Sequence, residues 1–147
     1  MVTRGRVVGI DLGERRIGVA VSDSARTLAM PRTTVVRSGD PSRDRSSLVA
    51  LVLEEGATQV VVGHPLSLDG SRGRAAGAAE AEVDALRALL DGHGVVVELF
   101  DERLTTVTAH QALRAGGTSG KASRKVIDRA AAAVLLQAWL DGQRGPA

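Results

Sequence analysis

Residues 7–13 read Val-Val-Gly-Ile-Asp-Leu-Gly, and residues 14–23 continue Glu-Arg-Arg-Ile-Gly-Val-Ala-Val-Ser-Asp. The β-branched residues of the first run favour a buried strand. Two apolar runs joined by a short polar turn predict a β-hairpin, with Asp11 at the exit of its first strand. Placing a carboxylate there costs desolvation free energy, which a cation or hydrogen bonds must offset. Asp11 is therefore either the cap of its own turn or a ligand for a cation.

Length and composition limit the class of protein. We expect residues 1–147 to form one domain, because this length suits a single hydrophobic core. The absence of cysteine excludes a disulfide framework and a thiolate metal site. The sequence shows neither an apolar run of membrane-spanning length nor a signal-peptide pattern. These features predict a cytoplasmic protein with no membrane partner.

Charge is distributed unevenly along a chain whose formal net charge is only +2. Residues 1–45 carry nine Arg and five acids, and residues 102–147 carry seven Lys or Arg and three acids. The middle segment is acidic. If the two basic ends share one face, they can meet a polyanion such as nucleic acid, although a solvated surface is the other interpretation. With one Phe, one Trp and no Tyr, base stacking is not expected to be the main binding mode.

Hydrophobic periodicity and turn residues predict the remaining elements. Strands are expected over residues 33–36, 59–63 and 95–100, and helices over 41–55, 73–91, 105–114 and 123–140. Asp40 followed by Pro41 is typical of a helix start. The order β-β-β-α-β-α-β-α-α predicts an α/β protein. Its mixed five-stranded sheet has an antiparallel first half and helices on both faces.

The last of these helices is predicted to bury one stripe of small and branched residues. The expected stripe consists of Ile127, Ala131, Val134 and Ala138. Asp128 lies at the edge of that stripe, and small residues follow it one turn later. Their size predicts a close approach of the helix to the sheet.

Three acids occupy positions that an α/β fold can bring together. Asp11 ends the first strand, Glu102 follows the last strand, and Asp128 lies in the last helix. If the first and last strands run side by side in the same direction, their carboxyl ends form one crevice. Clustered carboxylates repel one another unless cations lie between them. The trio therefore predicts a site for Mg²⁺ or Mn²⁺, and two such ions can promote phosphodiester cleavage. His64 and His110 lack metal-ligand spacing.

The chain resembles the YqgF/RuvX-like family of pre-16S rRNA nucleases, also described as Holliday-junction resolvase-like. The resemblance spans nearly the whole chain and is specific because four motifs occur in order. They are Gly-Ile-Asp-Leu-Gly with Arg-Arg-Ile-Gly-Val-Ala-Val-Ser-Asp over residues 9–23, Val-Gly-His-Pro-Leu with Asp-Gly-Ser over 62–71, Asp-Glu-Arg-Leu-Thr-Thr over 101–106, and Asp128 with the Ala-Ala and Leu-Leu-Gln that follow. His64 departs from the family, which often has an apolar residue there.

The resemblance implies a ribonuclease H-like fold and metal-dependent cleavage at the 5′ end of small-subunit rRNA. It implies that Asp11, Glu102 and Asp128 bind the metal and are catalytic. The basic residues near these acids are candidates for binding the substrate backbone: Arg15, Arg16, Lys121, Arg124 and Lys125. The expected partner is a structured rRNA precursor or branched DNA, and the expected state is a monomer or weak homodimer.

Three other functions remain open. A Holliday-junction resolvase would use the same chemistry on four-way DNA, but it needs a two-fold surface, and the sequence shows no strong dimer seam. A non-catalytic RNA- or transcription-associated binding module gains nothing from three anions facing a phosphate backbone. An ATP-binding protein of the actin or sugar-kinase type begins similarly, but 147 residues leave no room for its second domain.

Overall fold

The computed structural model describes residues 5–67, 69–105 and 121–144. Its strands are β1 (Arg6–Leu12), β2 (Arg16–Ser22), β3 (Ala29–Val36), β4 (Ala57–His64) and β5 (Val96–Asp101). They form one sheet in the order β3-β2-β1-β4-β5. The first three strands pair antiparallel, whereas β4 runs parallel to both β1 and β5. The predicted mixed sheet with an antiparallel first half is confirmed.

The described helices are α1 (Pro41–Glu54), α2 (Arg74–Leu90) and α4 (Lys121–Arg144), with two short 3₁₀ turns, η1 (Asp91–His93) and η2 (Glu102–Leu104). Asp40 begins α1 as predicted, because its carboxylate accepts hydrogen bonds from the backbone N–H groups of Ser42 and Arg43. Most of the predicted 105–114 helix and the loop after it lie outside the described residues. In the described part of the chain, no helix is both long enough and apolar enough to cross a membrane.

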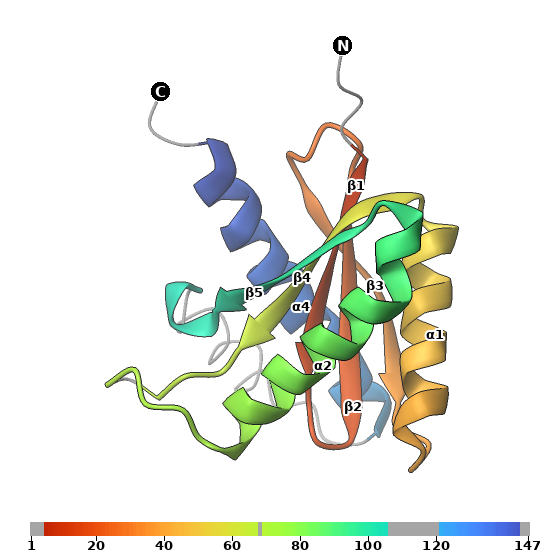
Figure 1. Cartoon of the computed structure of the whole chain (residues 1–147). Coiled ribbons are helices and arrows are strands. Elements are labelled where there is room, and N and C mark those ends of the chain that lie inside the picture. Colours follow the sequence, from red (N-terminus) through yellow and green to blue (C-terminus); the bar gives the residue numbers. More distant parts are fainter. Residues whose placement is uncertain (1–4, 68, 106–120, 145–147) are drawn as a thin grey trace.

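Each face of the sheet carries its own apolar core because side chains alternate along the strands. Val8 and Ile10 point to the face covered by α1 and α2, where Leu48 and Leu86 are buried with them. Val7 points to the opposite face, where α4 packs. Figure 1 shows α2 in green in front of the sheet and α4 in blue behind it. Helices on both faces are therefore confirmed.

The buried stripe of α4 differs from the predicted one. Among the side chains that the structure describes in this helix, the buried ones are Ala132, Leu135, Leu136, Trp139 and Leu140, whereas the residues of the predicted stripe are only partly buried. The helix is turned so that its larger apolar side chains face the sheet, which removes more apolar surface from water. The indole N–H of Trp139 donates to Glu98 Oε1 at 2.7 Å, which satisfies that buried donor.

β3 is longer than the predicted strand over residues 33–36. Its N-terminal half contains Pro31, which pairs with Ala20 of β2 where the register shifts. β3 is an edge strand, and proline is tolerated there because an outward N–H is not needed for pairing. Because proline usually argues against a strand, the first half of β3 was not predicted.

Candidate active site

Asp11 lies near the carboxyl end of β1, between two glycines on the neighbouring strands. It pairs with Gly18 of β2, and its preceding residue, Ile10, pairs with Val62 of β4. Continuing that register brings Asp11 beside Gly63. The condition stated for the convergence of Asp11 and Glu102, adjacent first and last strands, is not met, because β4 separates β1 from β5. Glu102, which follows β5, can therefore approach Asp11 only across β4.

Gly63 leaves space for the Glu102 side chain over β4. A Cβ at Gly63 would lie 3.1 Å from both Cγ and Cδ of Glu102, and closer still to Oε1. The Glu102 side chain thus occupies the space that any other residue at position 63 would fill. Glu102 begins η2 directly after β5, and its side chain lies over Gly63 of β4.

Gly18 gives α4 the same kind of access from the other side of Asp11. A Cβ at Gly18 would lie 2.7 Å from the carbonyl carbon of Asp128 and closer still to its oxygen. The α4 backbone therefore rests directly on β2 at the residue that pairs with Asp11. Because paired residues point to the same face, Asp11 and Asp128 lie on the same face of the sheet. The structure brings the three predicted acids toward one edge.

The acids do not form a closed metal cage. Across residues 5–67, 69–105 and 121–144, no group of three His, Cys, Asp or Glu residues is arranged to hold a metal ion. Asp128 is engaged elsewhere: its Oδ2 accepts a hydrogen bond from Arg16 Nε at 2.6 Å. The donor set is nevertheless suited to a hard cation, since carboxylate oxygens are the ligands that Mg²⁺ prefers.

A basic groove of about 590 Å³ lies at the β1–β2 turn, and its lining includes Arg16, the hydrogen-bond partner of Asp128. Its cations are Arg15, Arg16, Arg37 and Lys125, with Glu14 as the single acid in its lining. The structure thus gathers three of the predicted substrate-binding residues. The side chains of Lys121 and Arg124 lie outside the described part, although both residues belong to the first turns of α4. Arg37 is not among the residues that the sequence predicts to bind substrate, because its only signal there is that it directly follows a strand.

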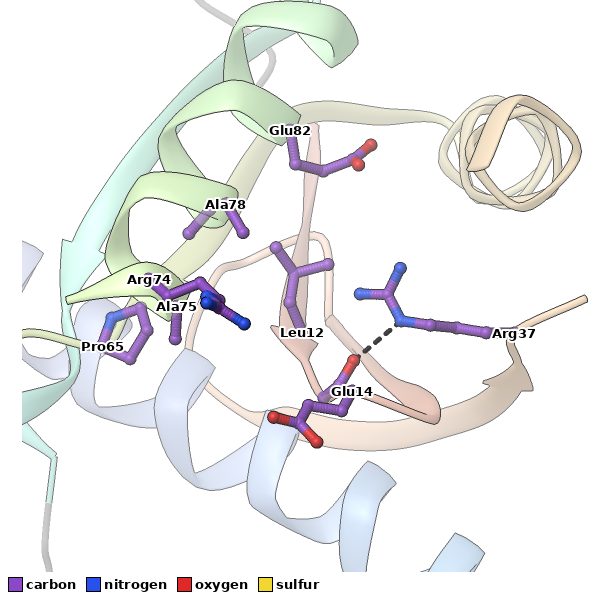
Figure 2. A pocket seen from close by; sticks show the side chains of 10 residues that line it. Leu12, Glu14, Arg37, Pro65, Arg74, Ala75, Ala78 and Glu82 are labelled. Atoms are coloured by element: carbon purple, nitrogen blue, oxygen red, sulfur yellow. Dashed lines mark hydrogen bonds between the residues drawn. The ribbon is translucent and has the colours of Figure 1, made fainter. Parts of the chain in front are cut away.

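A smaller hollow of about 270 Å³ opens on the opposite face, between the end of β1 and the start of α2. Figure 2 shows Arg37 and Arg74 extending toward the space around Leu12 from two sides. Arg37 Nε donates to the carbonyl oxygen of Gly13 at 2.8 Å, the dashed line in that view. Arg37 therefore ties the end of β3 to the hairpin turn and lines both hollows.

His64 has a structural partner on the α2 face and is no part of the acid cluster. Its Nε2 lies 2.7 Å from Oε2 of Glu80, which also accepts hydrogen bonds from Arg72. The hydrogen bond from Arg72, and after it the one from His64, lower the pKa of Glu80 from 4.5 to about 2. The contacts among His64, Arg72 and Glu80 stabilise the segment between β4 and α2.

Acid pH should weaken these contacts. A carboxylate with a lowered folded-state pKa contributes stability above its unfolded pKa and loses it as pH falls toward the folded one. We therefore expect the unfolding free energy of wild type to fall more steeply between about pH 4.5 and pH 2 than that of Glu80→Gln. Urea unfolding followed by circular dichroism measures this. Asp84→Asn, at an exposed carboxylate of the same helix, should keep the wild-type slope, and equal slopes for wild type and Glu80→Gln would contradict the assignment.

Comparison with known proteins decides the family. Residues 5–142 match the family model described as "RuvX: Holliday junction resolvase". This chain belongs to the RuvX family. Relatives named "Putative pre-16S rRNA nuclease" include one from Chloroflexus aggregans, 44% identical over 140 residues that cover 95% of this chain and 96% of the relative. Another, from Rhodococcus opacus, is 48% identical over 141 residues that cover 94% and 78%.

Solved structures agree on the fold of this RuvX protein. T. thermophilus RuvC in complex with a Holliday junction substrate matches with a TM-score of 0.60, at 15% identity over 97% of both chains. The yeast mitochondrial Holliday junction resolvase matches with a TM-score of 0.54, at 12% identity over 95% of this chain and 82% of that one. The predicted ribonuclease H-like fold is confirmed. Family membership also confirms the predicted enzyme class, a nuclease that hydrolyses phosphodiester bonds.

Proposed function

We propose that this RuvX protein is a cytoplasmic, metal-dependent endonuclease that processes the 5′ end of pre-16S rRNA, with residues 1–147 as one catalytic domain. The observation that carries the proposal is the pair of glycines beside Asp11, Gly18 and Gly63, which admit the Asp128 turn and the Glu102 side chain. Carboxylates that lie close together disfavour one another's ionised form unless cations offset the repulsion. The names of the relatives support rRNA as the substrate.

Asp11, Glu102 and Asp128 are the residues that would hold Mg²⁺ or Mn²⁺. When bound, such ions supply an activated water and stabilise the leaving oxygen of a phosphodiester. The chain itself contributes rigidity: Asp11 belongs to a strand hydrogen-bonded on both sides, and α4 is seated on β2 at Gly18. A rigid base for the ligands keeps them in position before the substrate arrives.

The basic groove is the proposed path of the RNA backbone. Arg15, Arg16 and Lys125 line it, and Lys121 and Arg124 precede Lys125 in the same helix. Arginine recognises phosphate oxygens through paired N–H donors, so a groove rich in arginine is suited to a phosphate backbone. We propose a monomer or weak homodimer, since one groove serves one set of acids. The family description favours four-way DNA as the alternative substrate.

Chelation should abolish cleavage. We expect no cutting of an RNA that spans the small-subunit 5′ boundary when EDTA is in excess, and restored cutting when Mg²⁺ or Mn²⁺ is added back. Ca²⁺ should restore little, because its looser coordination does not align an attacking water. Gel analysis of end-labelled RNA measures this. Full activity in excess chelator would refute the metal-dependent mechanism.

A further inference from the structure

Arg16 holds one of the three acids of the proposed site. The pair joins β2 to α4 between residues 112 positions apart in sequence, with 2.6 Å between Arg16 Nε and Asp128 Oδ2. Only 22% of the Arg16 side chain and 30% of the Asp128 side chain are exposed, so water screens the pair less than a surface ion pair. The contact is therefore a defined feature of the site.

The backbone of Asp128 is held in place, whereas its side chain can adopt different rotamers. Gly18 fixes the α4 backbone against β2, because the carbonyl group of Asp128 lies where a side chain at position 18 would be. Along β2, Arg16 and Gly18 point to the same face, and Gly18 pairs with Asp11. The Asp128 backbone therefore lies over the residue that pairs with Asp11, while its carboxylate contacts Arg16. A change of partner for this carboxylate needs rotation of the side chain and no movement of the helix.

Arg16 is also part of the basic groove. It lines the basic groove together with Arg15, Arg37 and Lys125. A guanidinium carries five N–H donors, and the contact with Asp128 occupies the one on Nε. A phosphate in the groove would offer Arg16 a bidentate partner with a full negative charge.

We propose that Arg16 is a positioning residue that exchanges Asp128 for a backbone phosphate of the nucleic acid, so that substrate binding releases Asp128 to the other acids. The inference rests on the proposed function and adds an order of events to it. Without nucleic acid, Arg16 offsets the charge of Asp128 and the site binds metal weakly. With nucleic acid in the groove, the same site binds metal more tightly. Substrate and metal thus bind with positive coupling, which is reciprocal by linkage.

The first test measures Mn²⁺ binding without nucleic acid by titration calorimetry. We expect Arg16→Gln to bind Mn²⁺ at least about fivefold more tightly than wild type, the lower end of typical coupling between sites. Arg15→Gln is the matched control, because it removes the same charge from the same groove but lacks the Asp128 contact. Its Mn²⁺ affinity should change by less than about twofold, a small part of that coupling range.

The second test measures the coupling itself by fluorescence anisotropy of a labelled ten-nucleotide single-stranded RNA, at constant ionic strength. In wild type, Ca²⁺ should tighten RNA binding relative to EDTA by about fivefold or more. In Arg16→Gln this factor should fall close to one. Arg16→Lys retains a charge for Asp128 but not the bidentate geometry. It should therefore keep a near-wild-type Mn²⁺ affinity with a reduced coupling factor, which keeps the test valid if Arg16→Gln does not fold.

The outcomes separate this inference from the function beneath it. Equal Mn²⁺ affinity in wild type and Asp11→Asn would refute the metal site, and with it both proposals. Weaker Mn²⁺ binding by Asp11→Asn, together with identical affinities for wild type and Arg16→Gln, would overturn the role of Arg16 alone. A coupling factor that persists in Arg16→Gln or Arg16→Lys would do the same.

Discussion

Asp11→Asn should lose nuclease activity while its fold is kept. The substitution preserves shape and removes one anionic ligand from the edge where β1 ends. We expect cleavage to fall by more than about 100-fold, beyond the effect of losing an outer-shell partner of a metal site. The thermal unfolding temperature should stay equal or rise, because one source of repulsion between the acids is gone. Single-turnover cleavage and a thermal melt measure the two effects.

Asp84→Asn is the control for the Asp11 prediction. Asp84 is an exposed carboxylate on α2, so its replacement changes the same charge away from the candidate site. Its cleavage rate should equal that of wild type. Wild-type cleavage by a clean preparation of Asp11→Asn would remove Asp11 from the site.

The two glycines beside Asp11 should respond differently to alanine. At Gly63, the new methyl group displaces the Glu102 side chain, which is flexible and only partly buried. We expect cleavage to fall by about 100-fold, as for a misplacement of about 1 Å, with a modest loss of stability. At Gly18, the methyl group meets the backbone of α4, which has no such freedom. Gly18→Ala should therefore cost about 1–3 kcal/mol of unfolding free energy.

Gly77→Ala provides the reference for both glycine variants. Gly77 lies inside α2, and a Cβ at this position would have nothing within 4 Å. Alanine there should therefore stabilise the protein by about 0.5–1 kcal/mol. Urea unfolding and a cleavage assay on the three variants separate the two effects. Wild-type cleavage by Gly63→Ala would show that Glu102 need not lie over β4.

Local patterns in the sequence were sufficient for most of the fold. The hairpin around Asp11 follows from two apolar runs and a polar turn, and α1 begins where Asp40 precedes Pro41. The rule that ligands gather at the carboxyl ends of parallel strands led to the expectation of Asp11 and Glu102 at one edge, although the strand adjacency assumed with it does not occur. These features depend on neighbours in sequence or on a general property of sheets.

Features that depend on long-range packing were not predictable from one sequence. The position of β4 between β1 and β5 is a choice of strand order. The roles of Gly18 and Gly63 become visible only when the chain segments above them are known. The same holds for the ion pair of Arg16 and Asp128, whose partners lie 112 residues apart. The orientation of α4, with its larger apolar side chains toward the sheet, likewise depends on packing.

The most direct test of the account offers the purified protein two substrates in Mg²⁺, with Asp11→Asn in parallel as a check for contaminating nucleases. One is an RNA that spans the pre-16S 5′ boundary, and the other is a DNA four-way junction. We expect Asp11-dependent cuts in the RNA and little or no symmetric cleavage of the junction, because paired cuts need a two-fold arrangement of sites. Paired, symmetry-related nicks in the junction with the RNA intact would contradict it, and so would cleavage of neither substrate.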